Sequence, residues 1–133
     1  MLVYNNIDSE YYGLRSSDIS KCLNASDDKT FVVVLDRKGI EKLKKRFGED
    51  TIHSVYIQID PEVAEFRLKR RDGKKRAISR IQADKKDDLW NRRGYDCVIS
   101  NDTTIKDLAY NFMNYVIAKK VETDMRKRGL LYD

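Results

Sequence analysis

The chain has 133 residues, of which 41% are hydrophobic and 37% charged, so it is long enough for one buried core and too short for two ordinary domains. No apolar stretch approaches the roughly 20 residues of a membrane-spanning helix, and two widely spaced cysteines, Cys22 and Cys97, match no metal-binding motif. We therefore expect one domain over residues 1–133 in a reducing cytoplasm, away from any membrane, with residues 129–133 as a tail.

The sequence of the first third of the chain predicts short strands and one short helix. Residues 1–14 carry few regular signals, so we expect a loop or a small edge strand there. Ser17 and Asp18 are suited to cap a short helix that runs to about residue 24. Residues 31–35, FVVVL, are a continuous apolar run that ends at Asp36. This pattern predicts a parallel strand, buried on both faces, with an acid at its carboxyl end.

The middle of the chain repeats this order of helix and strand. A helix is expected over residues 38–47, where apolar side chains recur on one face before Gly48. Residues 54–59 predict the next strand. Asp60 and Pro61 then provide a capping acid and a first-turn proline, which are typical of a helix start.

Positive charge is concentrated in a basic, lid-like segment over residues 66–93. Between Arg67 and Arg93 twelve Lys or Arg face four Asp, a net of +8, whereas the whole chain has a net charge of +5. A helix over residues 75–90 has few apolar anchors, which is typical of a mobile flap. The cluster fits either a phosphate-binding surface or a solvated helix face. No aromatic stacking pattern accompanies it, so nucleic acid is not a favoured partner.

The last strand is expected within residues 95–102, YDCVISND. Its apolar run stops at Asn101 and Asp102, where open α/β sheets bind their ligands. A long helix over residues 103–128 follows, with apolar residues at offsets of three and four. Together the elements predict a small three-layer α/β fold, with a mainly parallel sheet of about three core strands flanked by helices.

Seven features, in this order, resemble the guanylate kinase family over residues 1–118. They are YYG at 11–13, the strand that ends in Asp36 before Gly39, a strand that ends near Pro61, FRLKRR at 66–71, SRIQA at 79–83, YDCVISND at 95–102 and a long helix after it. The resemblance implies a P-loop kinase-like fold, with ATP and GMP as candidate ligands. No cofactor and no metal site is predicted from the residues alone.

The resemblance also implies roles for seven residues. Tyr12 with Gly13 would contact the GMP phosphate, Asp36 would read the guanine base, and Asn101 would lie beside the adenine. The catalytic candidates are the lid arginines that would reach the transferred phosphoryl group: Arg67, Arg71 and Arg80. Several arginines around a triphosphate are the expected equipment of phosphoryl transfer. The alternative for Arg67 is a solvated or ion-paired helix residue.

The departures from the family point away from catalysis. No GxxxxGK[ST] phosphate loop occurs in the sequence. Val3, Leu14 and Val34 stand where the family has a guanine-binding Glu, a Ser or Thr, and an Asp linked to the metal site. We therefore predict a degenerate guanylate-kinase-like protein that acts as a binding module. The alternative is a nucleotide binder completed by a partner or by an upstream phosphate-loop segment.

The missing phosphate-loop strand raises a question about the sheet. In the family this strand lies at the middle, between the strands that correspond to residues 31–35 and 54–59. Without it, these two strands either pair directly or leave a gap that a partner chain fills, because unpaired backbone groups are costly to bury. We therefore expect direct pairing, a protein partner or a homodimer.

Overall fold

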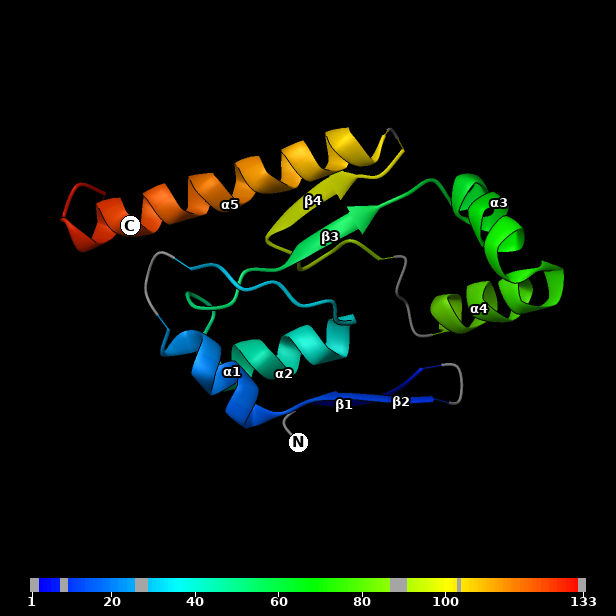
Figure 1. The fold of residues 1–133 in the computed structure, drawn as a ribbon, viewed down its shortest axis with the longest axis horizontal. Coiled ribbons are helices and arrows are strands. Elements are labelled where there is room, and N and C mark those ends of the chain that lie inside the picture. The colour runs from blue at the N-terminus through cyan, green and yellow to red at the C-terminus, as the bar shows by residue number, and fades with distance from the viewer. Residues whose placement is uncertain (1–2, 8–9, 26–28, 87–90, 103, 132–133) are drawn as a thin grey trace.

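The computed structural model describes residues 3–7, 10–25, 29–86, 91–102 and 104–131, with side chains from residue 13 onward. It contains helices and strands in mixed order (Figure 1). In chain order the elements are β1 (Val3–Ile7), β2 (Glu10–Leu14), α1 (Ser16–Leu23), α2 (Arg37–Phe47), β3 (Val55–Gln58), α3 (Pro61–Asp72), α4 (Lys74–Lys86), β4 (Cys97–Ser100) and α5 (Ile105–Lys127).

Strands β3 and β4 form a parallel pair at the centre of the described fold. Val55 lies opposite Cys97 and Gln58 opposite Ser100. The pairing continues past β4, where Asn101 N donates to Gln58 O at 2.7 Å. Ile99 on β4 is buried, at 6% exposed. Two of the predicted strands are therefore confirmed, together with their parallel direction.

Helices α5 and α2 lie near this pair. In the view of Figure 1, α5 runs above β4 and α2 lies below the pair. Helix α5 begins at Thr104, whose side chain accepts from Asp107 N at 3.2 Å. Helix α2 buries Leu43 and ends at Gly48, whose φ of 94° is a backbone conformation that glycine adopts at little cost. Both helices are close to their predicted bounds.

Strands β1 and β2 form an antiparallel hairpin that packs on α2. The predicted loop or small edge strand over residues 1–14 is thus a pair of short strands. Helix α1 follows at once, but its cap differs from the prediction. Arg15 takes the capping position and makes no side-chain hydrogen bond there, so Ser17 and Asp18 lie inside the helix.

The predicted strand over residues 31–35 is absent from the structure. This segment has neither helix nor strand, and its backbone makes no hydrogen bond with another described residue. Its first four side chains are open to solvent, from about half for Phe31 and Val33 to 93% for Val34, and Leu35 is half-buried. A strand exists only where a neighbour accepts its hydrogen bonds. The expected direct pairing with β3 does not occur, so the described sheet has two parallel strands instead of three.

The basic segment begins as a helical hairpin of α3 and α4, which lies to one side of the strand pair in Figure 1. The chain turns at Gly73, where φ is 85°. Ala64 and Ala77 are buried, and such small side chains let the two helices approach closely. Helix α4 is described as far as Lys86, and the rest of the predicted helix, with its expected anchor Trp90, lies outside the described residues.

Candidate functional site

The carboxyl ends of β3 and β4 gather polar groups, as the sequence predicted. Asp102 joins the two strand ends to α3. Its Oδ1 accepts from Asp60 N at 3.0 Å, and its Oδ2 accepts from Ser100 Oγ at 3.1 Å. The carboxylate of Asp60 in turn caps α3 by accepting from Glu62 N at 2.9 Å. Asp102 and Asp60 therefore hold the edge together, and three of their four carboxylate oxygens accept these hydrogen bonds.

Two arginines lie at the same edge. Arg67 Nη1 donates to Asn101 O at 3.1 Å, and Arg92 Nη1 donates to Gln58 Oε1 at 3.1 Å. Both guanidinium groups are exposed, and each has further N–H groups for another acceptor. We call Gln58, Arg67, Arg92 and Asn101 the carboxyl-end cluster. The fold thus brings together two predicted site residues that are 34 positions apart.

The other two catalytic candidates lie further along the hairpin, around Asp72. Arg71 forms a two-bond pair with it, from Nε at 2.8 Å and from Nη2 at 2.6 Å. These hydrogen bonds, with weaker attraction from Arg76 and Arg80, hold the pKa of Asp72 below its usual range. Arg80 also approaches Asp84 on α4 at 3.3 Å. The carboxylate of Asp72 therefore attracts three arginines of the basic hairpin, Arg71 most strongly.

The predicted base- and phosphate-contacting residues lie on the α2 side. Asp36 caps α2, because its Oδ1 accepts from Gly39 N at 2.9 Å. Tyr12 and Gly13 belong to β2, opposite Asn5 and Tyr4 of β1. The side chain of Tyr12 is outside the described residues. The observed role of Asp36 is thus structural, and the implied contact with guanine is untested.

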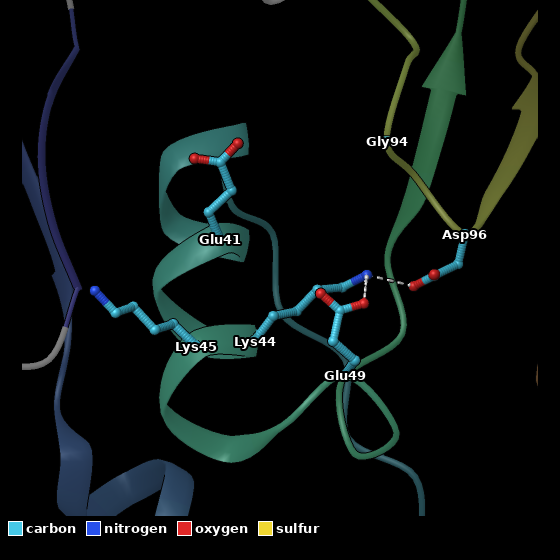
Figure 2. A pocket seen from close by; sticks show the side chains of 6 residues that line it. All are labelled: Glu41, Lys44, Lys45, Glu49, Gly94 and Asp96. Atoms are coloured by element: carbon cyan, nitrogen blue, oxygen red, sulfur yellow. Dashed lines mark hydrogen bonds and ion pairs between the residues drawn. The ribbon is translucent and has the colours of Figure 1, made fainter.

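The sequence analysis missed a charged cluster at the amino ends of the strands. Lys44 on α2 approaches Asp96 just before β4, at 2.8 Å, and Glu49 at 4.0 Å (Figure 2). They line an open hollow of about 370 Å³. Its lining residues are Glu41, Lys44, Lys45, Glu49, Gly94 and Asp96.

Asp96 has a largely structural role in this hollow. Burial alone would raise its pKa, but hydrogen bonds from Lys44 and Ser54 outweigh burial and hold the pKa below its usual range. The hollow also lies at the opposite end of the strands from the carboxyl-end cluster, whereas ligands of open α/β sheets bind beyond the carboxyl ends. We therefore assign the hollow to the scaffold.

A second missed cluster surrounds Arg37, the first residue of α2. Its guanidinium lies 5.2 Å from the centre of the Tyr95 ring and donates to Asn91 O. The Tyr95 ring lies 5.0 Å from that of Tyr56 on β3, and burial raises the pKa of Tyr56. Arginine and tyrosine surfaces pack well in such contacts. These contacts fix the start of α2 against the strand pair.

Comparison of the chain with known protein families, curated proteins and solved structures gave no match. The guanylate kinase resemblance therefore depends on the sequence motifs. Within the ranges that the structure describes, no three His, Cys, Asp or Glu side chains gather to hold a metal ion. No helix in the described part of the chain combines the length and apolar character needed to cross a membrane.

Proposed function

We propose that this chain is a guanylate-kinase-like module that binds a protein partner in the cytoplasm and does not phosphorylate GMP by itself. One observation carries the proposal. Residues 31–34 expose four consecutive apolar side chains, and the backbone of residues 31–35 makes no hydrogen bond with another described residue. Exposed runs of this kind, free at the backbone, are suited to accept a strand from another chain.

The outer edge of β3 supports the same proposal. Cys97 N donates to Ser54 O and Asn101 N donates to Gln58 O, so alternate residues of β3 direct their backbone groups toward β4. In a parallel ladder the residues between them, Val55 and Ile57, direct theirs to the other edge. Among the described strands only β4 pairs with β3. A partner strand at this edge would extend the two-stranded parallel pair toward the three core strands of the predicted fold.

The state of the predicted catalytic groups is also consistent with binding. Of the three predicted catalytic arginines, Arg71 is held by Asp72 and Arg80 by Asp84. A kinase needs several cations aimed at one phosphoryl group. These groups instead have partners in their own or adjacent turns.

The first test compares catalysis and partner capture. The purified chain, incubated with ATP and GMP, is expected to form no GDP above background. In affinity capture, Val33→Lys is expected to lose a protein that the wild type retains, because a charge on the exposed run opposes strand addition. Leu130→Lys is the matched control, since Leu130 is an exposed aliphatic residue elsewhere. GDP formation, or identical capture by both variants, would contradict the proposal.

A second function, nucleotide binding completed by a partner, is favoured by one contact. In the carboxyl-end cluster Arg67 donates to the backbone oxygen of Asn101, and Arg92 donates to the side chain of Gln58. Two exposed guanidinium groups at such an edge suit a phosphate. Titration calorimetry with ATP, GTP and GMP tests this function, and Arg67→Ala should weaken any observed affinity. The absence of heat with all three nucleotides, at concentrations that saturate a weak site, would remove it.

A further inference from the structure

Helix α5 carries apolar residues on two opposite sides. The side that packs toward β4 includes the half-buried Leu108, Phe112 and Val116. The other side carries a row at offsets of three, four and four, which places its members on one face of a helix. We call this row the α5 stripe. Its members are Tyr110, Met113, Ile117 and Val121.

The α5 stripe is uncovered within the described part of the chain, because each of its four residues is exposed by half or more. The chain as a whole also exposes too much surface. Its accessible area is 10358 Å², whereas a compact monomer of its 15.6 kDa exposes about 7,200 Å².

This difference, roughly 3,000 Å², is large enough for a stable interface between two copies. Standard interfaces cover about 800 Å² on each partner, and obligate homodimers cover more. A second copy could therefore cover the stripe and still leave part of the excess exposed. The excess area belongs to the chain as a whole. The exposed stripe identifies the surface, and the charges at its two ends identify the occupant.

The α5 stripe has opposite charges at its ends. Lys106 lies one turn before Tyr110, and Asp124 lies one turn after Val121, on the same face. Two antiparallel copies of α5, centred between Met113 and Ile117, therefore place Lys106 of each copy beside Asp124 of the other. Two-fold symmetry repeats the contact at both ends. Parallel copies would bring like charges together, which is unfavourable.

The charged groups are available for this contact. Lys106 is exposed and makes no ion pair with another described residue. Asp124 Oδ2 lies 3.1 Å from Arg128 Nε in an ion pair, and its other oxygen can pair with a second cation. We propose that the chain forms a homodimer in which two α5 helices pack antiparallel through the α5 stripe. This interface is separate from the strand edge at residues 31–35.

Sedimentation equilibrium with charge-reversed variants tests the proposal. Lys106→Glu and Asp124→Lys are each expected to weaken dimerisation by about tenfold or more, because each places like charges together. The double variant should restore most of the wild-type affinity. Lys21→Glu and Asp50→Lys change the net charge equally at exposed sites outside α5, and should leave the dimer unchanged. Circular dichroism confirms that each variant keeps its helices.

Ile117→Lys and Leu130→Lys form a second matched pair. The first should abolish the dimer and the second should not. A monomer at every concentration, or a dimer that survives Ile117→Lys, would overturn the proposal. Loss of the dimer in Val33→Lys alone would place the interface at the strand edge instead. Failure of the α5 dimer leaves partner capture through residues 31–35 unaffected, so the two proposals are tested separately.

Discussion

Lys44 and Asp96 join α2 to the amino end of the parallel strand pair. Lys44 Nζ lies 2.8 Å from Asp96 Oδ2, and the same oxygen accepts from Ser54 N at 2.7 Å and from Ser54 Oγ at 3.1 Å. Ser54 is only 3% exposed, and its hydroxyl also accepts from Asp96 N at 3.1 Å. One carboxylate therefore fixes the start of both strands and the position of α2.

This arrangement predicts a loss of stability in acid. The pKa of Asp96 is below its usual range in the folded chain, so its ionised form stabilises the fold at pH values above the unfolded pKa of about 3.9. The contribution is lost as the pH falls through the folded pKa. The free energy of unfolding, measured with urea between pH 7 and pH 3, should fall in this window.

Replacing Asp96 measures how much of the acid-induced loss of stability comes from this carboxylate. Asp96→Asn should lower the free energy of unfolding at neutral pH by about 1 to 2 kcal/mol, a value reduced for a side chain that is one-third exposed. The variant should also show a shallower acid dependence. Asp50→Asn removes an exposed carboxylate, so it should change neither quantity. An unaltered acid profile in Asp96→Asn would contradict the assigned role.

Asp36 allows capping to be separated from base recognition. Asp36→Ala removes the acceptor for Gly39 N, so it should destabilise the chain by about 0.5 to 2 kcal/mol. Asp36→Asn should keep most of the stability, because asparagine caps helices about as well. If calorimetry detects GMP binding, loss of that binding in Asp36→Asn, with stability retained, would show that the carboxylate also reads the base.

Leu43 and Val34 test where the core lies. Leu43 is 4% exposed on α2, so Leu43→Ala should cost about 2 to 5 kcal/mol. Val34 is 93% exposed, and Val34→Ala should change stability by less than about 0.5 kcal/mol. Denaturant titrations of the two variants provide the comparison. A large loss in Val34→Ala would mean that the run at residues 31–35 is covered in solution.

The contrast between two apolar runs explains which strands the sequence predicted correctly. Both FVVVL at residues 31–35 and CVIS at 97–100 have strong strand propensity. The second run pairs with β3, whereas the first pairs with no described strand. Propensity is a local property, but a strand requires a neighbour. The helices were predicted more accurately because their hydrogen bonds and caps lie within a few residues.

The contacts of the candidate site, like the strand pairing, could be predicted only where they depend on local sequence patterns. Asn101 was predicted at a strand end because the apolar run stops there, and Arg67 because of its motif. Their contact depends on how α3 leaves β3, which the local pattern does not encode. Lys44 and Asp96 are 52 positions apart and belong to no motif, so only the fold identifies their ion pair. The role of Asp36 as a cap could have been predicted, since an acid before a helix is a common start signal.

Tyr115 on α5 predicts a change of stability in alkali. Its hydroxyl is buried and has no hydrogen-bond partner among the described residues, and burial raises its pKa to about 12. The neutral phenol therefore stabilises the fold below the unfolded pKa of 10.0, and this contribution is lost as the pH rises toward 12.

Tyr115→Phe should remove this part of the pH dependence. Because phenylalanine lacks the unpaired hydroxyl, the variant should also be at least as stable as the wild type at pH 7. Urea titrations at pH 7, 10 and 11.5 measure both effects. A loss of more than about 1 kcal/mol in Tyr115→Phe at pH 7 would mean that the hydroxyl has a partner in solution.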